Sequence, residues 1–445
     1  MLGAIAKPCQ ARTCWNLAGW KKCFYRHTNR KTGSYDPTRR KQMNTISRKL
    51  RNMTAIAAVA AIAAPSFAAA DVTVGVLVPL TGELGEFGAI VAGGVEVAVN
   101  EINAAGGTSC GMLRTVIADT GGSAEKGIRE ATKMIETEGA VAILGPTSGV
   151  MVALVDLAKR RQTPIISPYA GTITLDELGG DYVYRTVGSD LGDGAAAGLW
   201  LTEKGYKSVA MLVQNEESTI SPAQVARAAL EEANVEITDY VIYNPGQPSY
   251  QAELVAVLAN NPDVIYLAGG QESGVTVMKE AAVGGFEGEW LLTADLAVPQ
   301  IFEAVDPRIL NGRAYVQLAE PDNSLPAYQT FAAKMMMETG AAPGPFAANS
   351  YDMAMLVALA LEGSEGCNGE AINSAIRDVT VDGEMVSDFA AARDLIAGGT
   401  NIDFEGASGP LTMDESGTPA GSFLIMRAED GAWVSEKFYP ATVFE

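Results

Sequence analysis

Hydroxyl side chains gather around a glycine-bounded loop, GPTSG, at residues 145–149. Thr147 and Ser148 follow one short apolar segment, and Thr172 follows the next apolar segment along the chain. Each segment is too short for a helix and ends at Gly or Pro, so we predict a strand, a loop, a helix and a second strand. Such a loop presents hydroxyls, backbone N–H groups and the positive end of a helix at the carboxyl edge of a sheet. This arrangement suits a small anion such as a carboxylate.

Two other interpretations of this loop stay open at this point. Thr147 or Ser148 could simply cap the helix that follows. The order GxxSG also has a superficial likeness to the GxSxG nucleophile elbow, but the spacing differs. The one histidine of the chain, His27, lies far upstream in sequence. Without a nearby histidine to activate the serine, we do not expect this chemistry.

The first 70 residues predict a leader that is removed on export. Basic residues precede an apolar run at 55–64 and the small residues 68–70, which is the pattern of a secretory signal peptide. The apolar run is too short to hold the protein in a membrane. We therefore expect the mature chain to begin at Asp71 in the periplasm. Met43 would begin a signal peptide of ordinary length, so residues 1–42 are interpreted as an upstream extension of the reading frame.

Charge narrows the function classes once the leader is removed. Residues 1–70 hold 13 Lys and Arg and one acidic residue, which leaves 19 of 32 basic and 52 of 53 acidic residues, a net charge of −33. Such a surface disfavours nucleic acid and anionic membranes as partners. His27 is lost with the leader, which excludes a Ser-His-Asp triad and a His-ligated zinc site. We expect no cofactor, no metal and no enzymatic activity.

Two cysteines remain after the leader, Cys110 and Cys367. Both lie in Gly-rich turns after predicted helices, and an oxidising compartment favours a bridge between them. The alternative is a pair of unpaired buried thiols.

Strands and helices alternate from Asp71 to residue 318. This alternation indicates parallel sheets covered on both faces, and ten strands exceed one comfortable sheet, so we predict an α/β protein with two doubly wound lobes. The predicted strands are 72–78, 113–118, 141–144, 164–167, 182–187, 208–213, 236–243, 264–268, 290–293 and 314–318. The predicted helices between them include 89–104, 124–138, 195–204, 221–233, 250–259 and 274–284.

The alternation of strands and helices ends after residue 318. Four helical stretches follow, at 323–339, 345–361, 370–376 and 387–396. Alternating apolar residues around Gly-centred turns near the C-terminus then predict a β-hairpin.

The first loop offers a different function class. Gly82, Gly85 and Gly88 follow a predicted strand, and Asp119 ends the next one, as in a dinucleotide-binding fold. The spacing GxxGxxG departs from the G-x-G-x-x-G fingerprint, so a nucleotide-cofactor enzyme is the weaker alternative.

Several motifs, in consistent order from Asp71 onward, resemble the leucine/isoleucine/valine-binding protein family: TVGVLVPLTGELGEFG, VNEINAAGG, VAILGPTSG, TPIISPYAGT, PDVIYLAGG and DFEGASGPLTMDESGTP. These are type I periplasmic binding proteins of branched-chain amino-acid ABC transporters. The resemblance implies two lobes joined by a three-strand hinge with a ligand in the cleft. By position the crossovers fall near 188–189, 315–318 and 419–423. The implied lobes are 71–188 with 317–420, and 189–316 with 421–445.

The resemblance also implies roles for single residues. Ser148, Ala170 and Thr172 match the donors that receive the ligand carboxylate, with Thr147 beside them. Asp295 matches the acidic partner of the ligand ammonium. Cleft aromatics are expected at Phe87 and Tyr169. The sequence departs from the family around Thr219 and Gly270, where branched-chain binders carry tyrosines, so the pocket is expected to be wider or more polar.

The resemblance implies a monomeric solute-binding protein that captures an amino acid or related small zwitterion and delivers it to an inner-membrane ABC permease. A ligand-sensing module of a receptor is the alternative with the same fold.

Overall fold

The computed structural model divides into two units, Met1–Phe67 and Ala68–Glu445, and describes residues 71–444. The predicted signal peptide and the upstream extension lie outside the described residues. Within 71–444, no helix has both the length and the apolar character needed to cross a membrane.

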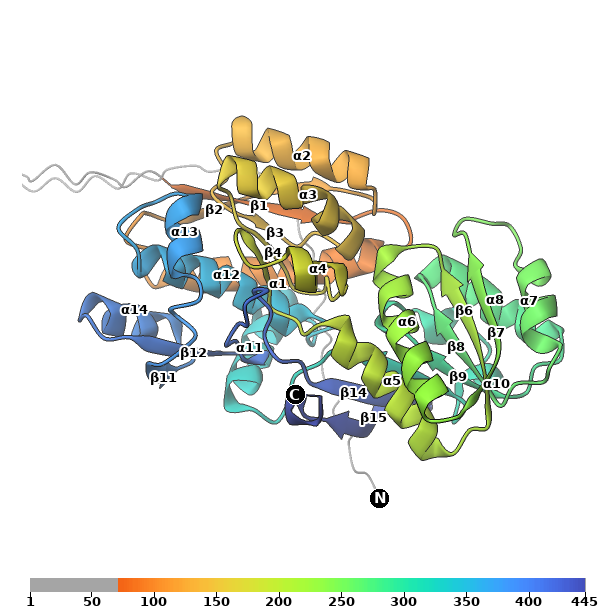
Figure 1. The fold of residues 1–445 in the computed structure, drawn as a ribbon. Coiled ribbons are helices and arrows are strands. Elements are labelled where there is room, and N and C mark those ends of the chain that lie inside the picture. Colours follow the sequence, from red (N-terminus) through yellow and green to blue (C-terminus); the bar gives the residue numbers. More distant parts are fainter. Residues whose placement is uncertain (1–70, 445) are drawn as a thin grey trace, which may run out of the picture. The chain divides into compact units, whose positions relative to one another are not determined.

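A five-stranded parallel sheet forms the core of the first lobe, in the order β2-β1-β3-β4-β5 (Figure 1). Its strands are β1 Val72–Val78, β2 Leu113–Asp119, β3 Ile143–Leu144, β4 Ile165–Ser167 and β5 Val183–Arg185. The helices of this lobe are α1 Gly85–Ala104, α2 Ala124–Glu136, α3 Ser148–Arg161, α4 Thr174–Leu178, α11 Pro326–Thr339, α12 Ala347–Glu362, α13 Gly369–Ala375 and α14 Phe389–Ala397. Alternate strand residues pack against α2 and α3 on one face and against α1 and α12 on the other. Both faces are therefore buried, as the apolar strands predict.

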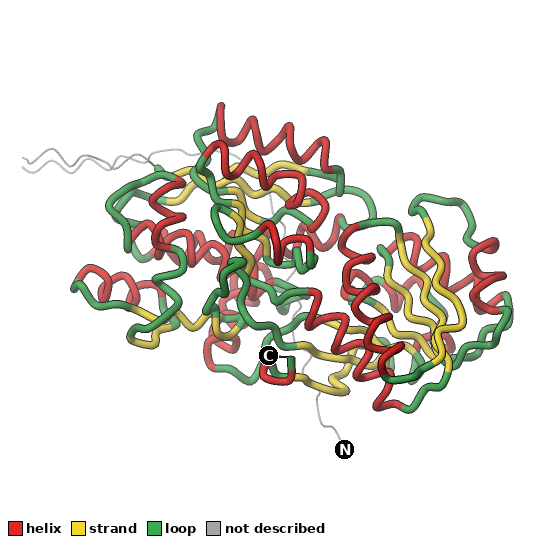
Figure 2. The backbone as a smooth tube through the Cα atoms, in the orientation of Figure 1, coloured by secondary structure: helices red, strands yellow, loops and turns green. Residues whose placement is uncertain are grey.

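A seven-stranded sheet forms the core of the second lobe, in the order β15-β14-β10-β9-β8-β6-β7. Its strands are β6 Ser208–Gln214, β7 Glu236–Tyr243, β8 Val264–Ala268, β9 Glu289–Leu292, β10 Ala314–Leu318, β14 Phe423–Glu429 and β15 Ala432–Tyr439. Its helices are α5 Asp190–Lys204, α6 Glu217–Glu232, α7 Gln251–Leu258, α8 Gln271–Val283, η1 Ala294–Leu296, α9 Ile301–Ala304, α10 Pro307–Leu310 and η2 Ala441–Val443. Helices α5 and α6 cover one face, and α7 and α8 cover the other. Figure 2 shows these helices flanking the strands of both lobes.

All ten predicted strands up to residue 318 are present, and the fold class is confirmed. The predicted C-terminal hairpin is also present as β14 and β15, which pair antiparallel. Its turn places Asp430 and Gly431 at positive φ, 49° and 84°, as a tight hairpin turn requires. A small third sheet of β11 Glu384–Val386, β12 Ile402–Gly406 and β13 Gly409–Pro410 was not predicted.

The chain passes between the two lobes three times. It leaves the first lobe after β5, returns to that lobe after β10, and leaves it again before β14. Strand β10 pairs with β14 through Leu318, so residues 317 and 318 belong to the second sheet rather than to the first lobe as expected. Gly188 and Gly421 bring two of the crossings together: a Cβ on Gly188 would lie 2.6 Å from the Gly421 Cα. Only glycine permits this close approach of two backbones.

The predicted disulfide is present between Cys110 and Cys367. It joins the turn after α1 to the turn after α12, two helices that pack side by side under the first sheet. The two cysteines are separated by 257 residues, so the bond closes a very long loop of the unfolded chain.

Replacing both cysteines, as Cys110→Ser with Cys367→Ser, should lower the free energy of unfolding by about 2–5 kcal/mol, because the unfolded chain regains the entropy of that loop. Chemical denaturation with and without reductant measures the effect. Reductant should destabilise the parent protein and leave the double variant unchanged. Alkylation of two thiols in the unreduced parent protein would contradict the bridge.

Candidate functional site

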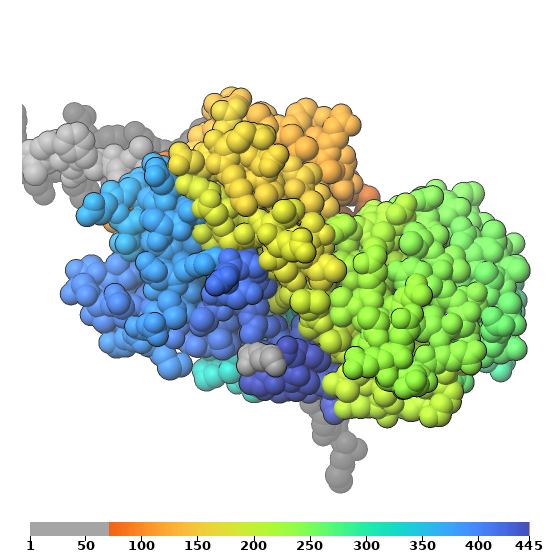
Figure 3. All heavy atoms as spheres, in the orientation of Figure 1, coloured from red at the N-terminus to blue at the C-terminus, as the bar shows by residue number. Residues whose placement is uncertain are grey.

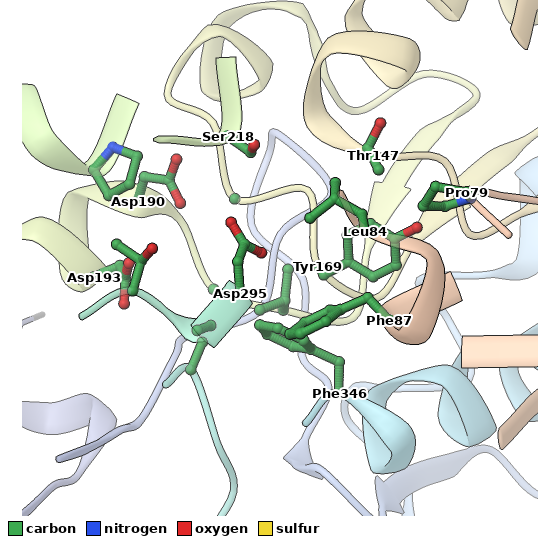
Figure 4. A pocket seen from close by; sticks show the side chains of 17 residues that line it. Pro79, Leu84, Phe87, Thr147, Tyr169, Asp190, Asp193, Ser218, Asp295 and Phe346 are labelled. Carbon is green, nitrogen blue, oxygen red and sulfur yellow. The ribbon is translucent and has the colours of Figure 1, made fainter. Parts of the chain in front are cut away.

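A cavity of about 70 Å³ lies between the two lobes, at the carboxyl ends of their parallel strands (Figure 4). This is the edge at which open α/β sheets bind ligands. The first lobe contributes mainly apolar and aromatic side chains to the wall: Pro79, Leu84, Phe87, Tyr169 and Phe346, together with Thr147. The second lobe contributes mainly polar ones: Asp190, Asp193, Ser218, Thr293 and Asp295. The cavity is small compared with the ~300–1,000 Å³ of drug-sized pockets, so it suits a compact solute.

Three aromatic rings form the apolar wall. The ring centroids of Phe87 and Phe346 are 5.8 Å apart, and those of Tyr169 and Phe346 are 6.0 Å apart. The Tyr169 hydroxyl donates to the Gly145 carbonyl at 2.6 Å, which turns its polar end away into the GPTSG loop. The rings therefore present a stiff aromatic surface to the cavity.

Phe346, which the sequence analysis did not single out, is held in an unusual backbone conformation. Its φ is +61°, in the left-handed region that a bulky residue rarely adopts. Its N–H donates to the Glu320 carboxylate at 3.2 Å, and its carbonyl accepts the Ser350 hydroxyl at 2.7 Å. Burial raises the pKa of Glu320 to about 7, and the Phe346 N–H opposes that shift. Strain of this kind persists where the surrounding structure holds a functional side chain in place.

Asp295 lies on the single turn η1, which follows strand β9 through Thr293. Its side chain stands between the aromatic rings of Phe87 and Phe346 on one side and Asp193 on the other (Figure 4). Burial, and next the nearby carboxylates Glu216, Asp193 and Glu83, together raise the pKa of Asp295 to about 7. No hydrogen bond from the described residues opposes this shift.

Asp190 and Asp193 lie in the first turn of α5 and complete an acidic wall. Asp190 is 8% exposed, and its Oδ2 has no hydrogen-bond partner among the described residues. Burial, and next the neighbouring Asp193 carboxylate, raise the pKa of Asp190 well above its ordinary value. Burial raises the pKa of Asp193 to about 6, although the Gln317 amide donates to its carboxylate at 2.7 Å.

No Lys or Arg of residues 71–444 lines this cavity. The nearest buried guanidinium is that of Arg185, which is 1% exposed and already engaged. It pairs with Asp176 and donates to the Gly171 and Thr172 carbonyls at 3.0 and 3.3 Å. The Arg185 charge and a hydrogen bond from Ser221 oppose the rise in the pKa of Asp190, but no ion pair within residues 71–444 joins a cationic side chain to Asp190, Asp193 or Asp295.

Four of the sequence-predicted site residues line the cavity: Phe87, Thr147, Tyr169 and Asp295. Thr219 and Gly270 are not among the lining residues and contact Gln214 instead. The Thr219 hydroxyl donates to the Gln214 carbonyl at 2.7 Å, and the Gly270 N–H donates to its side-chain oxygen at 2.8 Å.

The three predicted carboxylate donors do not appear in the cavity wall. Ser148 is 1% exposed at the start of α3. The Ala170 N–H donates to the Ser167 hydroxyl at 3.0 Å, and the Thr172 hydroxyl donates to Glu217 at 2.5 Å. Thr147 is the N-cap residue of α3, but its hydroxyl makes no capping bond to the described chain. The helix-cap interpretation therefore finds no support at Thr147.

The sequence analysis missed Asp190 and Asp193 because acidic residues are ordinary in the first turn of a helix, where they favour the positive end of the helix dipole. The available signal was two carboxylates spaced i, i+3 directly after a predicted crossover.

A family model described as a periplasmic binding protein matches residues 71–432. A Leu/Ile/Val-binding protein of Rhizobium johnstonii is 28% identical over 220 residues, which are 48% of this chain and 59% of that protein. The chain thus spans less than two thirds of that relative. A chemotactic signal transduction system substrate-binding protein of Halobacterium salinarum is 25% identical over 81% of this chain and 87% of its own length.

Among solved structures, a leucine-binding protein of Thermotoga maritima superposes with a TM-score of 0.72 at 22% identity. The superposition covers 82% of this chain and 98% of the other. At this identity the likeness shows a shared fold. The family model matches most of this chain, and the fold is shared with a solved structure. This chain therefore belongs to the periplasmic binding protein family.

Proposed function

We propose that this protein is a solute-binding protein, without enzymatic activity, that captures a small solute carrying an ammonium group. An amino acid or related zwitterion fits that description, and delivery to an inner-membrane ABC permease from the periplasm follows from the family. The observation that carries the proposal is Asp295, a buried carboxylate in a cavity between two lobes with no cationic side chain beside it. A buried charge of this kind needs a partner, which an ammonium ion supplies.

In this proposal the two lobes close around the solute, and the protein binds the solute without catalysing a reaction. The ammonium would contact Asp295 on the second lobe while the rest of the solute contacts Phe87 and Phe346 on the first. A ligand stabilises the closed state only through contacts that the open state lacks, and contacts to both lobes meet that condition. The three chain crossings are the proposed hinge, and residues 71–188 with 319–420 are proposed to move as one lobe.

A sensory role is the second candidate. The relative from Halobacterium salinarum, which matches most of this chain, is named as a substrate-binding protein of chemotactic signal transduction. A receptor, instead of a permease, could bind the same closed state, and the two roles would use one solute-binding site.

The Asp295 charge is tested by Asp295→Asn, which keeps the shape of the side chain and removes its charge. A thermal-shift screen of amino acids and small amines first identifies a binder, and titration calorimetry then measures its affinity. We expect the variant to lose about a hundred-fold in affinity, on the order of 3 kcal/mol, because the ligand ammonium is left buried without a counter-charge.

Glu303→Gln is the matched control for this experiment. It removes an exposed carboxylate on the nearby helix α9 and should leave the affinity unchanged. Equal affinity of Asp295→Asn and the parent would place the ammonium elsewhere and contradict the proposed role of Asp295.

The raised pKa of Asp295, about 7, predicts a pH dependence with a definite sign. An ammonium ligand pairs with the ionised carboxylate and stays charged itself up to high pH. Protonation of Asp295 therefore competes with binding, and affinity should fall by up to roughly ten-fold per pH unit as the pH drops from 7 to 5. Calorimetry at several pH values measures the fall, which Asp295→Asn should lessen.

The ligand-free protein should show the opposite trend. The pKa of Asp295, like those of Asp193 and Glu320, is raised by folding. The folded state therefore holds more protons than the unfolded state between about pH 4 and 7, and stability should decline as the pH rises through this window. Denaturant unfolding at pH 5.5 and 7.5 checks this sign, and equal or greater stability at pH 7.5 would contradict it.

A further inference from the structure

A carboxylate of the protein itself occupies the Thr172 hydroxyl, which the sequence analysis assigned to a ligand carboxylate, and the neighbouring Thr174 hydroxyl. The hydroxyls of Thr172 and Thr174 both donate to Oε1 of Glu217, at 2.5 and 2.8 Å. Glu217 belongs to the first turn of α6, on the second lobe, whereas both threonines belong to the first. The Ile173 N–H donates to the Ser221 hydroxyl of the same helix at 3.1 Å and strengthens this contact.

The backbone donors next to these threonines are engaged as well. The Ala170 N–H donates to Ser167, and the Gly171 N–H donates to the Tyr169 carbonyl at 3.1 Å. In the space-filling view, the yellow residues of this segment meet the green residues of the second lobe (Figure 3). A ligand carboxylate would have to displace Glu217 to reach these hydroxyls.

The charge of the cavity also disfavours a carboxylate ligand. Asp190, Asp193 and Asp295 line it, and Oδ2 of Asp190 is buried without a partner among the described residues. Nothing cationic from the described chain shares the wall. A ligand carboxylate would add negative charge to an enclosed space that three carboxyl groups already line and where charges interact strongly.

The opposite wall is suited to a cation. The faces of aromatic rings attract ammonium groups, most strongly where water is excluded. Phe87, Tyr169 and Phe346 offer three rings on the side of the cavity that faces Asp295 (Figure 4). Their apolar surface also suits a short methylene chain.

We infer that the solute is an organic cation without a carboxylate, namely a short aliphatic diamine. One ammonium group pairs with Asp295 beside the aromatic rings, and the other meets Asp190 and Asp193 at the start of α5. A single ammonium would leave part of this acidic wall without a counter-charge. The inference rests on the proposed solute-binding function and narrows its ligand from zwitterion to dication.

The test compares 1,4-diaminobutane with 4-aminobutanoate, in which a carboxylate replaces one terminal CH2–NH3+ group of the diamine. Calorimetry at pH 7.5 on the purified protein should give at least ten-fold tighter binding of the diamine. Butylamine, with one ammonium group, should also bind at least ten-fold more weakly than the diamine. Equal or tighter binding of 4-aminobutanoate, of butylamine or of leucine would overturn the inference.

The same titrations separate this inference from the proposed function. If the diamine fails but an amino acid binds, the ligand class is wrong and the solute-binding function stands. If no amine and no amino acid binds, the proposed function itself fails and the inference fails with it.

Glu217 supplies an independent test. Glu217→Ala frees the hydroxyls of Thr172 and Thr174 and removes one negative charge, so the preference for the diamine over 4-aminobutanoate should shrink by at least five-fold. Glu217→Gln keeps the side-chain volume and serves as the second variant if the alanine variant folds poorly. It should also reduce the preference for the diamine over 4-aminobutanoate. The control is Glu232→Gln, an exposed residue on the same helix, which should leave the ratio unchanged. An unchanged ratio in both Glu217 variants would refute the role given to Glu217.

Discussion

Buried carboxylates without cationic partners set the limits on what this cleft can hold. Asp190, Asp193 and Asp295 meet in a small cavity, and the nearby Arg185 already pairs with Asp176 and with backbone carbonyls. Removing charge from water is costly, so burial raises the pKa values of these groups. A positively charged ligand relieves that cost, and an anionic one increases it.

The protein also uses its own carboxylates to hold the two lobes together. Glu83 of the first lobe accepts the N–H groups of Glu272 and Ser273 at the start of α8, at 3.0 and 3.2 Å. Glu217 of the second lobe accepts two hydroxyls of the first. Each contact places an anion where N–H or O–H donors are exposed, as at other helix starts and loops. These contacts of the chain itself join the two lobes in this structure.

The fold is shared with a leucine-binding protein of Thermotoga maritima, and a shared fold does not by itself set the chemistry of the cavity wall. Shared architecture places loops at the carboxyl edges of two sheets, whereas the side chains on those loops decide the ligand. Here the hydroxyl-rich loop GPTSG contributes Thr147 to the wall, and the acidic turn of α5 contributes the charge. Fold and specificity thus depend on different residues of the same segments.

The sequence by itself determined the local elements. Apolar strands bounded by Gly and Pro predicted ten strands, and the C-terminal turn and the pairing of Cys110 with Cys367 were also predictable. The loop pattern placed Thr147 in the candidate site, and the resemblance added Asp295, Phe87 and Tyr169. Only the tertiary structure showed that Asp190 and Phe346 share that cavity and that Glu217 occupies the hydroxyls of Thr172 and Thr174. The physical reason is that strand and helix signals lie within a few neighbouring residues. The environment of a carboxylate depends on groups distant in sequence, and only folding brings those groups together.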